Sequence, residues 1–96
     1  MSLPIKNAAY TFCIVLIDAA NTTQFLVTPT VVAGDVKVSI DFGALNNITA
    51  VPTVVNGQVE VQLTAAEMNG DSITVQFEDQ TVGPEWLPMR VIIPTI

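Results

Sequence analysis

The segment from Gln58 to Asp79 constrains the fold more than any other part of the chain. In Gln58 to Leu63, valine and leucine alternate with glutamine and glutamate, and in Ile73 to Glu78 apolar residues again alternate with polar ones. A period of two places successive side chains on opposite faces of a strand. Each of these segments is therefore predicted to be a β-strand with one buried face and one exposed face.

The residues between these two strands predict a helical corner. Thr64 and Glu67 have capping-box spacing, in which each side chain accepts a hydrogen bond from the backbone amide of the other residue. Gly70 is expected to end this turn, because glycine adopts a left-handed conformation without a Cβ clash. We expect one short helical turn near Thr64–Met68 with an architectural role. The alternative is an ion or partner site at Glu67 and Asp71.

Turn-forming residues divide the rest of the chain into further short strands. Asn56-Gly57 predicts a two-residue hairpin, and Asp41-Phe42-Gly43 predicts a reversal. The other predicted strands cover residues 9–18, 23–27 with an edge extension at 30–32, 35–41, 48–55 with an interruption at Pro52, and 86–93. About seven strands with turn signals between them predict an all-β fold, an antiparallel two-sheet sandwich of immunoglobulin-like type.

The length of the chain and its first residues predict one domain with an arm. Ninety-six residues are the size of a single small sandwich. Residues 1–7 contain Pro4, which lacks a backbone donor, and are predicted to form an extended N-terminal arm. Residues 8–96 are predicted to form a single β-sandwich domain.

The predicted strand at residues 9–18 is apolar on both faces. Such a pattern indicates a central position, or an outer face that is covered. Cys13 is the only cysteine of the chain, so no internal disulfide can form. Between two apolar neighbours, we expect it to be a buried and unreactive thiol.

The composition bears on possible partners. Half of the residues are hydrophobic and the mean hydropathy is +0.54, so we expect other subunits to cover part of the surface of so small a domain. The net charge of −6 has the wrong sign for binding nucleic acid. The longest mainly apolar run, residues 8–17, is about half of the ~20 residues that a membrane-spanning helix needs. We therefore expect neither nucleic acid nor a membrane as a partner.

The residues that usually carry catalysis are absent or isolated. The chain has no histidine, and no serine stands in a nucleophile elbow. We expect no enzyme activity, no catalytic residues and no cofactor. Glu78 and Asp79, with Asp71 or Glu85 brought near by folding, are the best candidates for a calcium site. No spacing resembles an EF-hand, so we expect ordinary loop charges and no metal site.

Several sequence blocks together resemble small β-sandwich structural proteins of tailed bacteriophages. The blocks are Ala9 to Phe12, Ala20 to Thr22, Ala33 to Ser39, Leu63 to Asp71 and Gly83 to Trp86, and the resemblance covers nearly the whole chain. It implies a virion structural protein without catalytic residues, first of all a capsid decoration (cement) protein that binds the shell and stabilises it. A tail, neck or fibre module is the alternative. The implied partners are the major capsid protein or other virion proteins and further copies of the chain, and the implied location is the virion.

The arm and the last predicted strand are the segments that we expect at contacts with partners. Trp86 has two interpretations, an exposed anchor or a core residue capping the sandwich. As an exposed anchor, with carboxylates nearby, it would also suit a carbohydrate-binding adhesion domain, which is a third function. The predicted contact residues are Pro4, Ile5, Lys6, Trp86, Met89, Ile92 and Ile96.

Overall fold

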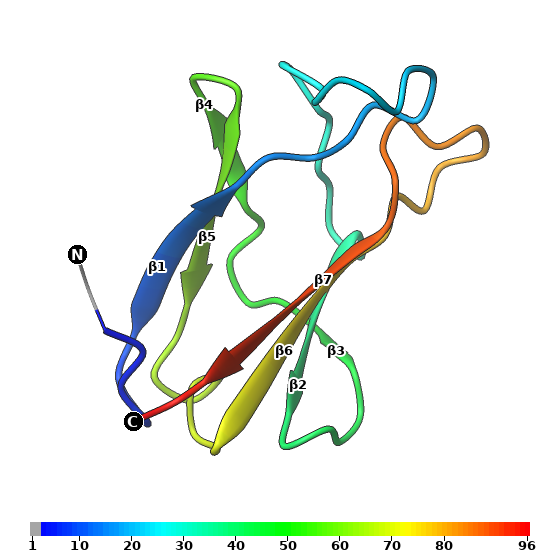
Figure 1. Cartoon of the computed structure of the whole chain (residues 1–96). Coiled ribbons are helices and arrows are strands. Elements are labelled where there is room, and N and C mark those ends of the chain that lie inside the picture. Colours follow the sequence, from blue (N-terminus) through cyan, green and yellow to red (C-terminus); the bar gives the residue numbers. More distant parts are fainter. Residues whose placement is uncertain (1–2) are drawn as a thin grey trace.

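The computed structural model describes residues 3–96, which form seven β-strands in two antiparallel sheets and no helix. One sheet has the strand order β1-β5-β4 and the other β3-β2-β6-β7 (Figure 1). This confirms the predicted all-β, two-sheet architecture. The strands are β1 (Tyr10–Ile14), β2 (Val36–Ile40), β3 (Asn46–Asn47), β4 (Thr53–Val55), β5 (Gln58–Leu63), β6 (Ser72–Phe77) and β7 (Met89–Pro94).

The alternating segments supply the centre of the core, as predicted. β5 and β6 belong to different sheets, and their apolar side chains join one buried cluster. Complete burial of each such side chain stabilises the fold by about 1.5–3 kcal/mol. The contributing residues are Val59, Val61 and Leu63 from β5 and Ile73, Val75 and Phe77 from β6.

Two tight turns confirm the predicted reversals. Asn56 and Gly57 have φ values of 51° and 77° and connect β4 to β5, as a hairpin turn with two left-handed residues requires. At the end of β2, Asp41 and Phe42 have φ values of 51° and 59°, and the Gly43 amide donates to the Ile40 carbonyl at 3.0 Å. A left-handed Phe42 is unusual, because a bulky side chain is disfavoured in this conformation.

The corner between β5 and β6 is a hydrogen-bonded turn at residues 65–68. The predicted capping box is present: the Thr64 amide donates to Glu67 Oε1 at 2.8 Å, and the Glu67 amide donates to Thr64 Oγ1 at 3.2 Å. The reason given for Gly70 was wrong, since Gly70 is not among the residues with positive φ. A Cβ there would lie 2.5 Å from Ile40 Cγ2, so this position needs glycine for its close approach to the end of β2.

Strand β1 is an edge strand, and its outer face is exposed. It pairs with β5 alone, and Cys13 is exposed on it. The prediction of a central strand was therefore wrong, and so was the prediction of a buried thiol. Apolar residues on both faces did not show which side the second sheet would cover, because only Tyr10, Phe12 and Ile14 pack against the core.

Three other predicted strands have different limits in the structure. Residues 23–27 form no strand and contribute only an isolated bridge between Phe25 and Ile17. Of the segment predicted at 48–55, only the residues after Pro52 form a strand, which is β4. The short strand β3 ends just before this segment begins. The last strand begins at Met89 rather than at Trp86, which forms an isolated bridge with Asp18.

Replacement of Gly70 by alanine is expected to destabilise the protein by about 1–3 kcal/mol, because the new methyl group overlaps the Ile40 side chain. Urea unfolding followed by circular dichroism measures this change. Asn69→Ala, at the exposed neighbouring position, is the matched control and should leave the midpoint nearly unchanged. Equal midpoints for Gly70→Ala and wild type would show that the close approach is not required.

Candidate functional site

Most acidic side chains accept hydrogen bonds from backbone amides. Six of the nine acidic residues do so, and among residues 3–96 the other three accept only from side chains. Carboxylates are strong acceptors, and an amide that donates to one is satisfied without a β-ladder. The loops are thus held together by carboxylates. The six residues are Asp18, Asp35, Asp41, Glu67, Asp79 and Glu85.

Asp35 connects the start of β2 to the loop after β6. Its side chain is buried, with Oδ2 accepting from the Val32 amide and Oδ1 from the Gln80 amide, both at 3.1 Å. The Glu78 amide also donates to the Asp35 carbonyl at 2.8 Å. A buried carboxylate is costly unless it is hydrogen-bonded, and here both oxygens are.

Asp79 holds the loop between β6 and β7. Its Oδ1 accepts from the Thr81 hydroxyl at 2.6 Å and amide at 3.1 Å, and its Oδ2 accepts from the Glu85 amide at 2.8 Å. Burial tends to raise the pKa of Asp79, but the hydrogen bonds from Thr81 and Glu85 outweigh it and hold the pKa below the usual Asp value. Glu85 accepts in turn from the Thr30 amide at 3.2 Å, which ties a third loop to this end.

The candidate calcium ligands do not all come together. Asp71 and Asp79 lie beyond opposite ends of β6, whereas Asp79 and Glu85 both line a cavity of about 270 Å³. The oxygens of Asp79 and one oxygen of Glu85 already accept the amides described above. Within residues 3–96, no group of three or more His, Cys, Asp or Glu side chains is arranged to hold a metal ion.

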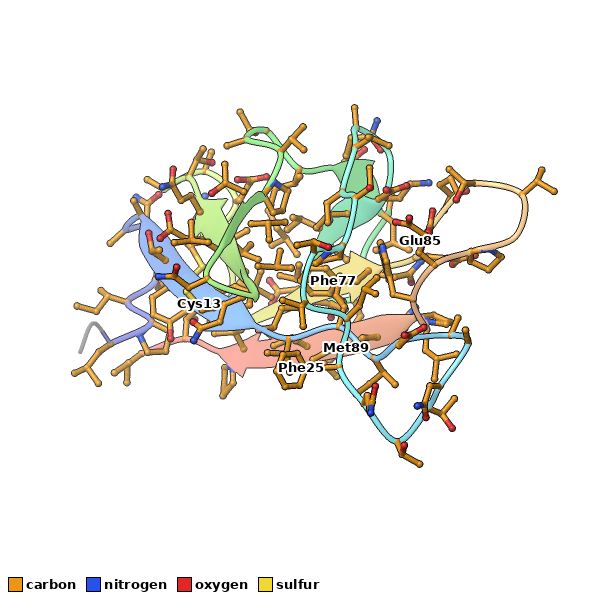
Figure 2. The ribbon with its side chains drawn as sticks, turned by 90° about the horizontal axis from the view of Figure 1, so that it is seen from above. Cys13, Phe25, Phe77, Glu85 and Met89 are labelled. Atoms are coloured by element: carbon orange, nitrogen blue, oxygen red, sulfur yellow. The ribbon has the colours of Figure 1, made fainter. Side chains whose placement is uncertain are left out.

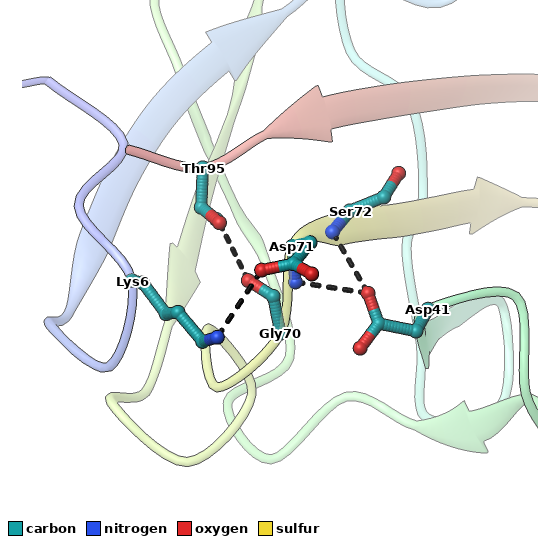
Figure 3. A network of polar contacts seen from close by, with 6 residues as sticks. All are labelled: Lys6, Asp41, Gly70, Asp71, Ser72 and Thr95. Carbon is teal, nitrogen blue, oxygen red and sulfur yellow. Dashed lines mark hydrogen bonds and ion pairs between the residues drawn. The ribbon is translucent and has the colours of Figure 1, made fainter.

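A second polar network joins the two termini to the other end of the sandwich (Figure 3). Asp41 Oδ1 accepts from the Asp71 amide at 2.8 Å and the Ser72 amide at 3.0 Å. Lys6 Nζ lies 3.1 Å from Asp71 Oδ1, and the Thr95 hydroxyl donates to the Gly70 carbonyl. The ion pair is exposed and contributes little. The bonds that the Asp41 carboxylate accepts from the Asp71 and Ser72 amides are therefore the ones that hold the left-handed turn in place.

The N-terminal arm is hydrogen-bonded to its own domain where it is described. The Ile96 amide donates to the Pro4 carbonyl and the Lys6 amide donates to the Ile96 carbonyl, both at 2.9 Å. The Asn7 amide donates to the Met68 carbonyl at 2.9 Å. Met1 and Ser2, which the arm prediction includes, lie outside the described residues.

The structure separates the predicted contact residues into two groups. Trp86 is fully buried, its indole donating to the Thr30 carbonyl at 3.3 Å, and Met89 packs against the same core. Of the two interpretations of Trp86, the core position is the one observed, and a direct partner contact there does not agree with the fold. Pro4 is half-buried, while the other four are exposed: Ile5, Lys6, Ile92 and Ile96.

Ile5 and Ile96 are backbone neighbours beyond the end of β7, and Ile92 lies on the strand itself. Ile5 stands between Pro4 and Lys6, which both hydrogen-bond to Ile96. Ile92 is an exposed position of β7, and Ile96 follows two residues after the strand ends at Pro94. Both are more than half exposed. This apolar surface, which we call the β7 end patch, is defined by Ile5, Ile92 and Ile96.

The sequence did not reveal the outer surface of the four-stranded sheet. Thr74 lies on the predicted exposed face of its strand, yet Thr74 and its cross-strand partner Ser39 are both buried. Phe42 and Leu45, with Arg90 from β7, line a depression of about 130 Å³ above them. Phe42 itself is 70% exposed. The turn residues signalled a reversal there, but not that the loop folds back over the sheet.

Comparisons of this chain with known protein families, curated proteins and solved structures found no match.

Asp79 predicts a loss of stability in acid. Its depressed folded-state pKa means that the carboxylate contributes stability above the unfolded-state pKa, which is lost as the pH falls through the folded-state pKa. Asp79→Asn should therefore lower the urea midpoint at neutral pH, and the difference from wild type should shrink below the ordinary Asp pKa of about 3.9.

Urea unfolding at neutral and acidic pH checks this, with Glu60→Gln as control, because Glu60 accepts only from the Gln62 side chain. The control should differ little from wild type at neutral pH. A difference between Asp79→Asn and wild type that stays constant with pH would contradict the interpretation.

Proposed function

We propose that this protein is a bacteriophage virion structural protein, and that its function is binding to other virion proteins. In the first place we propose a capsid decoration (cement) subunit that binds the major capsid protein and further copies of itself. The sequence blocks that resemble phage structural proteins support this, since they extend over nearly the whole chain. The proposed location is the virion, and the proposed mechanism needs no catalytic residue or cofactor.

The observation that carries the proposal is the exposure of large apolar side chains. They lie on strands and loops of both sheets and on the described part of the arm, and several are more than half exposed. Burial of such surface against a partner stabilises a complex by about 25 cal/mol per Å². The β7 end patch is the proposed contact with the shell, because it joins three of these side chains: Ile5 at 51%, Ile92 at 53% and Ile96 at 70% exposure.

We also propose that the sandwich is immunoglobulin-like. In that fold one sheet contains strands B, E and D in this order, and the other contains C, F and G, with C′ added beside C in the variable type. β1-β5-β4 and β3-β2-β6-β7 follow the same two orders. The turn at residues 65–68 then occupies the corner between strands E and F. We propose that this turn has the helical character that the sequence predicts.

A tail, neck or fibre module remains the second candidate, since the exposed apolar surface suits either place in a particle. The carbohydrate-binding alternative depended on an exposed Trp86. Because the indole is fully buried, it offers no face on which a sugar could stack.

Quantitative mass spectrometry of purified particles from the genome that encodes this chain tests the proposal. A decoration protein should be present in a fixed and high ratio to the major capsid protein, whereas a tail part should be present in few copies. Absence of the chain from purified particles would contradict both.

Substitution at the β7 end patch tests the contact surface. Ile92→Ser removes an exposed apolar side chain, so we expect reduced occupancy on particles and an almost unchanged urea midpoint. Val55→Ser is the matched control, because Val55 is similarly exposed at 49% but lies on β4 of the other sheet. Equal occupancy for Ile92→Ser and the control would exclude this patch as the contact.

A further inference from the structure

Strand β1 presents a free edge that lacks the usual protection. An unpaired edge exposes a row of backbone donors and acceptors, and natural proteins shorten such edges or place proline and charged residues on them. β3 has only two residues, β4 has three and follows Pro52, and β7 carries Arg90 and Pro94. β1 has five residues, Tyr-Thr-Phe-Cys-Ile, with neither proline nor charge. Among the described strands, it is the edge most open to strand addition.

The exposure of the β1 side chains also indicates that this edge is open to a further strand. Tyr10, Phe12 and Ile14 point toward the core but remain only partly buried. Thr11 and Cys13 point away from the core and are exposed, and Cys13 is visible on this strand in Figure 2. A further strand beside β1 would cover the exposed sides of the three inward residues and pair the free backbone groups.

We propose that β1 of a second copy occupies this edge, in an antiparallel arrangement about a two-fold axis. A strand that pairs with its own copy in this way makes a closed, self-complementary interface. The two three-stranded sheets would join in the order β4-β5-β1-β1-β5-β4. The result is a symmetric dimer with a continuous sheet.

Charge favours a second copy over another occupant. Two molecules with a net charge of −6 repel each other, so their contact must avoid the acidic residues. β1 itself is uncharged, and the charged residue nearest to it in the register, Glu60 opposite Cys13, lies on β5, one strand away from the free edge. A charged segment of another protein would meet no complementary charge along this strand. The uncharged β1 edge, with its β-branched and aromatic residues, can pair with the same edge of a second copy.

This inference specifies the self-association within the proposed function, and it depends on the fold of the isolated chain. Its test uses the purified protein alone. A failure here would leave the copy number in virions unaffected, and the absence of the chain from particles would leave the dimer unaffected.

Sedimentation equilibrium of the full chain, under reducing conditions, is the first measurement. We expect a reversible monomer–dimer equilibrium, and we expect Thr11→Lys to weaken it about tenfold or more, because lysine on an edge opposes pairing and the two-fold axis brings both charges to one seam. Gln62→Lys is the matched control. Gln62 is the cross-strand partner of Thr11 on β5, so it adds the same charge to the same face one strand away from the edge.

Hydrogen exchange of the wild-type β1 amides is the second measurement, and it does not depend on any variant folding. Alternate amides of Tyr10–Ile14, those not bonded to β5, should become protected as the protein concentration rises. A protein that stays monomeric at every concentration, a dimer equally weakened by both lysine variants, or a dimer without concentration-dependent protection in β1 would each overturn the proposal.

Discussion

The hydrogen bond from a backbone amide to a loop carboxylate is the interaction on which the rest of this structure depends. Long connections between the strands must satisfy their donors without a ladder, and Asp35, Asp41, Glu67 and Asp79 each accept two backbone amides. This use of carboxylates explains how a chain with nine acidic and three basic residues folds with a single ion pair among its described residues. The negative charge of these carboxylates is compensated by the dipoles of backbone amides rather than by cations.

These carboxylates fix both ends of the sandwich. At one end Asp35 and Asp79, with Glu85, join the loops around β2 and the connection from β6 to β7. At the other end Asp41 holds the beginning of β6 against the end of β2, next to the paired termini. A domain stabilised in this way can leave apolar side chains on its surface without losing its shape, which suits the proposed binding function.

The sequence predicted the parts of the fold that depend on neighbouring residues. Alternation located β5 and β6, Asn56-Gly57 located a hairpin, and the spacing of Thr64 and Glu67 identified a capping pair. Each of these signals acts within a few residues, so it depends little on the rest of the fold.

The errors concern long-range relations. Cys13 was placed inside because both faces of its strand are apolar, and only the assembled sheets show which face is covered. Gly70 was attributed to its own backbone conformation, whereas its neighbour in space, Ile40, is the cause. Of the predicted contact residues, Trp86 and Met89 pack in the core, where the bridge between Asp18 and Trp86 and the start of β7 at Met89 place them.

Native-state hydrogen exchange of the loop amides tests the central claim most directly. The donors to the carboxylates are the amides of Ala20, Thr30, Val32, Thr49, Thr64, Asp71, Ser72, Gln80, Thr81 and Glu85. If these bonds hold the fold together, the amides should open with free energies close to those of the β5 and β6 amides. Exchange at the rate of unprotected peptide amides, while the strands stay protected, would contradict the account.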